Sequence, residues 1–238
     1  MFSLTLLCGF AVTTQSVAVT QAERLNEDWW KARHEHCKQI TQQGGVELAF
    51  LGDSITQGWE GGGKATWDRY YGTRRAANFG FSGDRTEHVL WRLAHGELIG
   101  LKPKVIVIMI GTNNIGHGSS DSVQTAAGVK MIVRTLRKGI PNAKILLLNI
   151  FPRGADSKDA MRVAVADASA RWQSLSDGKH VFCEDVGHFF LNRDGTMRSL
   201  LVPDFLHPNS AGYGIWAKAM EPKLAELLGE PANTFGRP

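Results

Sequence analysis

Cysteine is scarce in this sequence, with only Cys8, Cys37 and Cys183 among 238 residues. No Cys-x-x-Cys pair occurs, so the sequence indicates neither a disulfide framework nor a cysteine-based metal site. We expect Cys37 and Cys183 to be small buried hydrophobic residues, one in a helix and one in a strand. The eight histidines form no metal-ligand pattern either. His34 and His36, for example, lie two apart on a predicted helix and would point to different faces.

An excess of charge of one sign is also missing. The formal net charge is +4, and the 27 Lys and Arg residues are scattered, with Arg74-Arg75 and Arg137-Lys138 as the only adjacent pairs. The sequence has no arginine-rich arm and no stripe of interleaved aromatic and basic residues, which are typical of nucleic-acid-binding proteins. We therefore predict no nucleic-acid partner.

Long hydrophobic runs are missing as well. Residues 2–19 are apolar, but they are too short and too often interrupted by Thr, Ser and Gln for a membrane span, so we predict no stable membrane insertion. The stretch resembles the apolar part of a secretory signal, although no Lys or Arg precedes it. We interpret residues 1–20 as a signal remnant, which predicts a secreted or periplasmic protein, or else as an N-terminal extension of a cytoplasmic one. Residues 21–229 would form one domain and residues 230–238 a flexible tail.

What the sequence does contain is an alternation of apolar runs and helical segments. Five buried strands are predicted near residues 46–52, 75–81, 104–110, 144–151 and 180–186. Helices are predicted at residues 21–43, 86–93, 123–138, 158–175 and 210–228. This alternation predicts an α/β protein, with a parallel sheet covered by helices on both faces. Ligands of such sheets bind at the carboxyl ends of the strands.

A serine stands where the first predicted strand ends, in the segment VELAFLGDSITQG of residues 46–58. Ser54 is well placed for nucleophilic work, because the strand fixes its position and the following helix N-terminus favours negative charge. The same residues are also ordinary loop chemistry, in which Asp53 or Ser54 caps the helix. A nucleophile further needs a base and an oxyanion site.

Asp204 and His207 are candidates for the base. They lie three residues apart in a predicted turn before the last helix, where they can share one side. A carboxylate beside an imidazole fixes its tautomer and stabilises the imidazolium. The alternative is an ordinary loop aspartate and a histidine beside a proline. Gly83 and Asn113 follow the ends of the second and third predicted strands, so they should lie at the same sheet edge as Ser54.

Residues 58–64 fit most of the phosphate-binding pattern G-x-x-x-x-G-K, which makes a P-loop phosphotransferase one alternative. However, Ala65 occupies the position that should supply a Ser or Thr to magnesium. The segment also starts several residues after the strand should end. We interpret it as a flexible glycine loop at the wall of a pocket.

Four blocks of residues, in the same order, resemble the SGNH-hydrolase superfamily of GDSL-type esterases. Gly52-Asp53-Ser54-Ile55-Thr56 resembles the first block and Gly83, in Phe81-Ser82-Gly83, the second. Gly111-Thr112-Asn113-Asn114 resembles the third block and Asp204-Phe205-Leu206-His207-Pro208 the last. Within this superfamily, the sequence most resembles the branch that is similar to platelet-activating-factor acetylhydrolases. The residues that carry this resemblance are Trp29-Trp30, Gly58-Trp59 and Gly212-Tyr213.

The resemblance implies a three-layer α/β/α sandwich with a five-stranded parallel sheet and a flavodoxin-like fold. It implies that Ser54 is the nucleophile, that His207 is the general base and that Asp204 orients His207. The oxyanion hole would consist of the backbone N–H groups of Ser54 and Gly83 and the side-chain amide of Asn113.

The neighbours of these residues are expected in lesser roles. Asp53 should hydrogen bond within its turn and take no part in catalysis. Trp59, Arg85 and His117 could line the pocket.

We therefore predict a serine esterase that acts on carboxylic esters without a metal or other cofactor. Its substrate would be a small-molecule, carbohydrate or lipid ester. The absence of a long hydrophobic lid segment and the leader-like start favour short acyl chains, such as acetyl groups on sugars. Alternatives are a lysophospholipase, lipase or thioesterase of the same superfamily, and a non-catalytic carbohydrate- or protein-binding member. A homodimer is compatible with the related branch.

Overall fold

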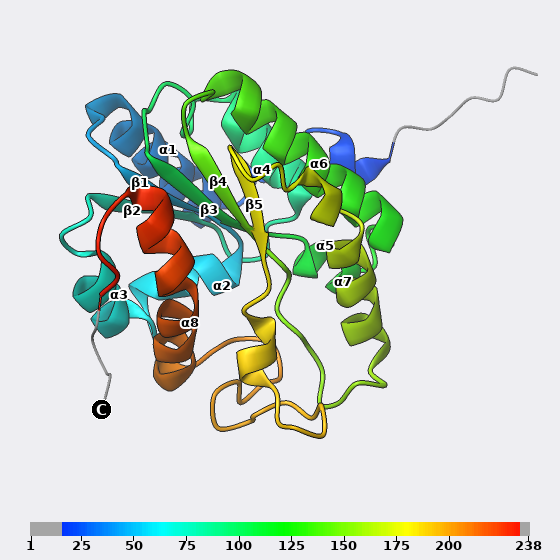
Figure 1. Cartoon of the computed structure of the whole chain (residues 1–238). Coiled ribbons are helices and arrows are strands. Elements are labelled where there is room, and N and C mark those ends of the chain that lie inside the picture. Colours follow the sequence, from blue (N-terminus) through cyan, green and yellow to red (C-terminus); the bar gives the residue numbers. More distant parts are fainter. Residues whose placement is uncertain (1–15, 234–238) are drawn as a thin grey trace, which may run out of the picture.

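The computed structural model describes residues 16–233, which contain a five-stranded parallel sheet in the order β2-β1-β3-β4-β5 (Figure 1). The order and direction are those of the flavodoxin-like fold that the family resemblance implies. The strands are shorter than predicted, because only part of each apolar run pairs with a neighbour. They are β1 (Leu48–Gly52), β2 (Ala76–Gly80), β3 (Val105–Met109), β4 (Lys144–Leu148) and β5 (Val181–Glu184).

Helices cover both faces of the sheet and complete the predicted three-layer α/β/α sandwich. On one face lie α1 (Asp28–Gln43), α4 (Thr86–Ala94), α6 (Ser122–Gly139) and α7 (Ala160–Ala170). On the other lie α3 (Lys64–Tyr71) and α8 (Ser210–Leu228). The strands are apolar throughout because both of their faces are buried, with Ala49 and Leu51 in one hydrophobic cluster and Leu48 and Phe50 in the other.

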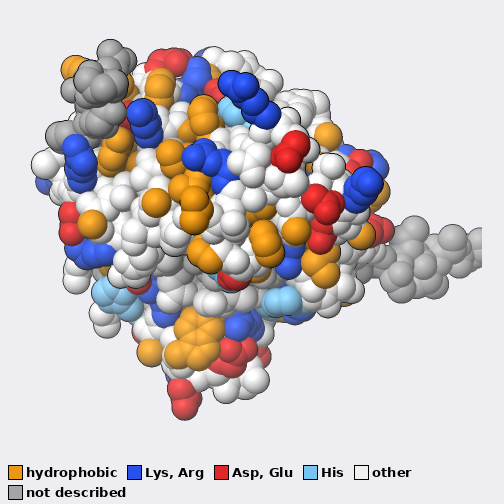
Figure 2. Space-filling model, turned by 90° about the horizontal axis from the view of Figure 1, so that it is seen from below, with side chains coloured by type: hydrophobic (Ala, Val, Ile, Leu, Met, Phe, Trp, Pro, Cys, Tyr) orange, Lys and Arg blue, Asp and Glu red, His pale blue; other side chains and the backbone are white. Residues whose placement is uncertain are grey.

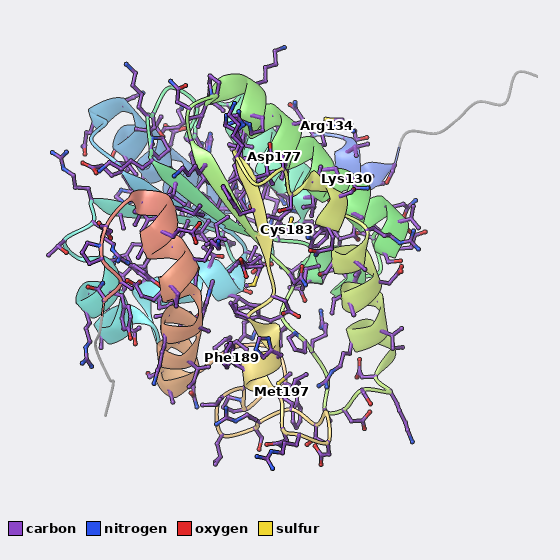
Figure 3. All side chains as sticks on the ribbon, in the orientation of Figure 1. Lys130, Arg134, Asp177, Cys183, Phe189 and Met197 are labelled. Carbon is purple, nitrogen blue, oxygen red and sulfur yellow. The ribbon has the colours of Figure 1, made fainter. Side chains whose placement is uncertain are left out.

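All strands end at the lower edge of the sheet in Figure 1, and short helices follow several of them. Figure 3 labels Cys183 in β5 and, below it, Phe189 and Met197 in the connection that leads to α8. Apart from the helix expected after Ser54, the short elements were not predicted, since one helical turn has no periodicity to detect. They are α2 (Ser54–Gln57), α5 (Thr112–Gly116), and the 3₁₀ turns η1 (Val17–Val19), η2 (Gly58–Glu60), η3 (Gln173–Leu175) and η4 (Gly187–Phe190).

The glycine loop after Ser54 is not a flexible wall. Gly58 belongs to η2, and a Cβ added at Gly58 would lie 2.0 Å from the Tyr213 hydroxyl. A Cβ at Gly63 would lie 2.7 Å from the Trp59 ring. Lys64 begins α3 and pairs with Asp68 at 2.6 Å. These glycines therefore allow close packing of this loop against α8. This packing explains the glycines of the P-loop-like pattern without a role in phosphate binding.

Both described ends of the chain are attached to the body of the protein. Within the predicted leader, Ala18 is fully buried, and its carbonyl accepts a hydrogen bond of 2.8 Å from the Thr86 hydroxyl. Residues 1–15 of that leader lie outside the described residues. In the predicted flexible tail, the Asn233 backbone N–H donates to Glu221 at 2.7 Å, and Glu230 pairs with Arg74 at 2.5 Å. Residues 230–233 thus extend the folded part.

The remaining predictions concern single residues. Cys37 is buried as expected, whereas Cys183 is only half-buried, and Cys8 lies outside the described residues. His34 is buried and its ring lies 2.6 Å from Glu97, while His36 is exposed. Within residues 16–233, no helix is both long and apolar enough to cross a membrane.

Candidate active site

The site begins at the junction of β1 and α2, where close packing fixes Ser54. A Cβ at Gly52 would lie 2.4 Å from the Met109 carbonyl oxygen and 2.2 Å from the Thr56 hydroxyl, so only glycine fits under α2. Asp53 caps α2 by accepting a hydrogen bond of 3.0 Å from the Ile55 N–H, as predicted. Burial of its carboxyl raises the pKa of Asp53 to about 7, against the opposing effect of that hydrogen bond.

The neighbouring strand β2 supports the same turn through Asn78, which the sequence analysis did not single out. The Asn78 side chain donates to the Thr56 carbonyl at 3.0 Å and accepts from the Gly80 N–H at 2.8 Å. Gln57 of α2 in turn accepts a hydrogen bond of 2.7 Å from the Ser82 N–H. The Ser54 turn and the Ser82-Gly83 loop are therefore joined by side-chain hydrogen bonds.

His207 reaches Ser54 from the loop before α8. The Ser54 Oγ and His207 Nε2 atoms lie 3.0 Å apart, and His207 Nδ1 lies 2.7 Å from Asp204 Oδ2. The other oxygen, Asp204 Oδ1, accepts from the backbone N–H groups of Leu206 at 3.0 Å and His207 at 2.7 Å. Three side chains that are far apart in the sequence thus form one hydrogen-bonded chain.

The protonation states in this chain follow from the carboxylate. Although burial acts in the opposite direction, the hydrogen bonds from His207 and Leu206 lower the pKa of Asp204 below its ordinary value. An ionised carboxylate only accepts hydrogen bonds, so Nδ1 of His207 carries the proton. In the neutral imidazole, Nε2 is then the acceptor that faces the Ser54 hydroxyl.

The site is open to solvent. The side chains of Asp204 and His207 are 56% and 42% exposed. Figure 2 views the molecule from the side of this edge and shows a mixed face, on which basic, acidic and apolar side chains lie among one another. Asp204 and His207 are therefore accessible from solvent, while Ser54 is half-buried.

Two further groups lie on loops that face this edge. Gly111, with φ of +121°, is the N-cap residue of α5 and allows the chain to turn shortly after β3. Asn113, on that turn, donates from Nδ2 to the Asp84 carbonyl at 2.9 Å, which ties it to the loop that holds Gly83. Gly83 has φ of +73°, which favours glycine.

A buried ionic cluster around Asp84, the residue after Gly83, fixes the Gly83 loop. The fully buried Asp84 carboxylate accepts hydrogen bonds from Trp30 Nε1 at 2.8 Å, Arg92 Nε at 2.8 Å and Arg24 Nη1 at 3.0 Å. Arg24 also donates to the Ser82 carbonyl at 2.7 Å. Sequence reasoning missed this cluster, because its members come from three separate segments of the chain.

The three residues that were predicted to line the pocket differ in their exposure to solvent. The prediction for Trp59 is wrong, because its ring is fully buried between Tyr213 and Trp216, at centroid distances of 4.6 and 4.8 Å. Arg85 is half-buried, with its Nε atom 2.7 Å from Glu87.

His117 lies exposed at the end of α5. Burial and then the positive charges of Arg85, Arg24 and Arg153 lower the pKa of His117 below its ordinary value, which favours its neutral form. His117 and Arg85 therefore lie within electrostatic range of each other and remain candidates for contact with a substrate.

Among residues 16–233, no group of three or more His, Cys, Asp or Glu residues is arranged to hold a metal ion. The groups that the site brings together are a hydroxyl, an imidazole, a carboxylate and a side-chain amide. These groups are suited to acyl transfer.

Comparison with known proteins identifies the family of this chain. The model of the GDSL-like lipase/acylhydrolase family matches residues 50–215. The platelet-activating factor acetylhydrolase IB subunit alpha2 of Gallus gallus is 33% identical over 205 residues, covering 86% of this chain and 87% of that protein.

Solved structures share the fold at low sequence identity. A GDSL-like lipase from Bacteroides thetaiotaomicron superposes with a TM-score of 0.68 and 16% identity, covering 82% of this chain and 98% of that one. An acetylxylan esterase from Geobacillus stearothermophilus superposes with a TM-score of 0.62 and 20% identity, covering 80% of this chain and 98% of that one. The five-stranded sheet and its helices thus match those of SGNH hydrolases. The sequence matches show that this chain belongs to the GDSL-like lipase/acylhydrolase family of hydrolases.

Proposed function

We propose that this protein hydrolyses short-chain carboxylic esters, acetyl esters above all, through a covalent acyl-Ser54 intermediate. The observation that carries the proposal is the hydrogen-bonded chain Ser54–His207–Asp204, with heavy-atom distances of 3.0 and 2.7 Å. These distances lie within the range that proton transfer to a general base needs. Asp204 orients the His207 ring, and it stabilises the imidazolium that forms.

The reaction has two steps. In the first, His207 Nε2 takes the Ser54 proton while Oγ attacks the ester carbonyl carbon. The imidazolium then gives that proton to the leaving alcohol, and the acyl group remains on Ser54. In the second, a water molecule loses a proton to His207 and attacks the acyl carbon, which releases the carboxylic acid and restores Ser54.

The negative charge of each tetrahedral intermediate needs donors. We assign this role to the backbone N–H groups of Ser54 and Gly83 and to the Asn113 side-chain amide. The amide of Asn113 carries two hydrogens, of which the bond to the Asp84 carbonyl uses one. Its second hydrogen is available for the oxyanion.

The preference for a short acyl group rests on two arguments. The catalytic histidine and aspartate are exposed, and a site this open offers little apolar surface to bury a long chain. In addition, the relatives include a protein named platelet-activating factor acetylhydrolase and one named acetylxylan esterase, and both names refer to acetyl esters. A lipase, lysophospholipase or thioesterase remains the second candidate.

The direct test measures hydrolysis of p-nitrophenyl acetate by the wild type, Ser54→Ala and His207→Ala. Both variants should lose turnover while they keep the wild-type circular dichroism spectrum. Full activity of Ser54→Ala would refute the mechanism. A fluorophosphonate probe should label Ser54 of the wild type, and a folded protein that resists the probe would favour a non-catalytic binding member.

A series of p-nitrophenyl esters from acetyl to decanoyl tests the acyl preference. We expect kcat/KM to be highest at the short end. A maximum at the longest chains would instead support the lipase alternative.

A further inference from the structure

Arg153, in the loop after β4, is a half-buried cation for which the proposed reaction has no use. Its Nη1 atom donates to the Thr112 carbonyl at 3.0 Å and to the Thr112 hydroxyl at 3.1 Å. Within residues 16–233, Nε and Nη2 make no hydrogen bond, and no carboxylate lies within ion-pair distance. Burial lowers the pKa of Arg153 below its ordinary value, and Asp159 and Asp53 only partly offset this.

Four other arginines with largely buried side chains have partners for all three of their nitrogens. Arg24, Arg74 and Arg92 each pair with carboxylates at 3.0 Å or less. Arg162 uses its three nitrogens to donate to the carbonyls of Arg153, Gly154 and Gly195. A charge that is held away from water normally has a partner, so we expect the Nε and Nη2 atoms of Arg153 to bind one.

Two hydrogen bonds and one electrostatic effect link Arg153 and its loop to the residues around Ser54. Thr112, which it binds, directly precedes Asn113. The next residue, Gly154, donates its N–H to the Phe205 carbonyl at 3.0 Å, inside the turn that connects Asp204 to His207. In addition, the charge of Arg153 acts on Asp53, the neighbour of Ser54.

The surroundings hold the guanidinium in place. A Cβ at Gly116 would lie 2.4 Å from Arg153 Nη1, so glycine at this position makes the room that the guanidinium occupies. Arg162 fixes the backbone of the Arg153 loop through two carbonyls. A cation that is held this firmly, with unused donors, is prepared to bind a ligand.

We propose that Arg153 is a specificity-determining residue that binds an anionic oxygen of the substrate, either a carboxylate or a phosphate group carried by the ester. This inference rests on the proposed ester hydrolysis at Ser54. Nε and Nη2 lie on one side of the planar guanidinium, and this side binds two oxygens of an anion with parallel hydrogen bonds. The preferred substrates would then be short-chain esters of anionic compounds.

The test compares three acetate esters of one shape. Methyl 4-acetoxybenzoate is neutral, 4-acetoxybenzoate carries a carboxylate, and 4-acetoxyphenyl phosphate carries a phosphate. Each variant is scored by its kcat/KM relative to the wild type on the same ester, which cancels differences in leaving-group reactivity. The carboxylate and phosphate esters separate the two sources of the anion.

We expect Arg153→Gln to lower kcat/KM by about tenfold or more for at least one anionic ester, mainly through KM. Its effect on the neutral ester should stay within about twofold. Arg153→Lys should recover part of the loss, because it keeps the charge without the planar donors. Arg75→Gln is the matched control. It removes the same charge from an exposed side chain at the amino end of β2, and it should change none of the three rates.

Equal losses on neutral and anionic esters would overturn the proposal and assign Arg153 a structural role in the loop. Unchanged rates on all three esters would overturn it as well. If Arg153→Gln does not fold, Arg153→Lys decides by the same comparison. Failure of the wild type to hydrolyse any of these esters would refute the proposed function itself, which keeps the two results separate.

Discussion

The two adjacent asparagines of α5 offer a sharp test of how this site divides catalysis from stability. Asn113 donates one hydrogen to the Asp84 carbonyl, and its second hydrogen is assigned to the oxyanion. Asn114 accepts from the Thr86 N–H at 3.0 Å and donates to the Thr86 hydroxyl at 3.1 Å and to Glu87 at 2.9 Å. The same residue type at neighbouring positions should therefore respond to Ala substitution in different ways.

The expected magnitudes follow from these contacts. Asn113→Ala removes one oxyanion donor, which typically lowers kcat by about 10²–10³-fold, or roughly 3–4 kcal/mol of transition-state stabilisation. It also removes one buried hydrogen bond, for a loss of about 1 kcal/mol in the free energy of unfolding. Asn114→Ala removes three buried hydrogen bonds, so its free energy of unfolding should fall by about 3 kcal/mol. Its kcat should change far less than that of Asn113→Ala.

Both variants are measured by p-nitrophenyl acetate kinetics and by urea denaturation. The critical comparison is the kcat of Asn113→Ala, measured where the protein remains folded. A kcat within about threefold of the wild type would refute the role of Asn113 as an oxyanion donor. If Asn114→Ala loses as much kcat without losing stability, the division between the two residues is wrong.

Two further predictions concern buried carboxyls. Because folding raises the pKa of Asp53 to about 7 from an ordinary 3.8, the folded protein keeps a proton that the unfolded chain releases. The free energy of unfolding should therefore fall as pH rises from about 4 to 7, by an amount on the order of a few kcal/mol. Asp53→Asn should remove this pH dependence when unfolding is measured by denaturation curves. The same pH dependence in Asp53→Asn as in the wild type would contradict this prediction. Glu221→Gln breaks the buried bidentate pair with Arg74, at 2.7 and 2.6 Å, and should lower the free energy of unfolding by about 3 kcal/mol. The control Glu226→Gln, in an exposed pair with Lys223, should cost less than about 1 kcal/mol, and equal effects would show that burial does not matter here.

The sheet was accessible to prediction because its strands are continuous apolar runs. Such runs are buried on both faces, and residues 105–109 illustrate this with VIVIM. No helix is predicted from the sequence for α3, because three glycines precede it and it has only eight residues, although Trp67, Tyr70 and Tyr71 lie at helical spacing. Trp59 was placed at the pocket because it follows the Ser54 turn. Its burial depends on α3 and α8, and local sequence does not show which helices will cover a side chain.

The residues of the candidate site differ in the same way. Ser54, Asp204 and His207 could be proposed from short motifs, whose spacing is visible in the chain. Arg153 could not, because its significance lies in its contact with Thr112, 41 positions away, and in what it does not contact. The segment Phe151-Pro152-Arg153-Gly154 after a buried strand was the only local signal.

The pairing of the strands has a consequence for the tolerance of this site to change. Gly52 at the end of β1 lies opposite Gly80 of β2 and Met109 of β3, and the loops with Ser54, Gly83 and Asn113 begin just beyond these pairs. A slip of one residue would move a loop by about 3.3 Å along its strand, more than the length of a hydrogen bond. Interior side chains such as Phe50 or Ile108 therefore set the positions of reacting atoms that they never touch. Substitutions at these positions can therefore lower the catalytic rate while the protein remains folded.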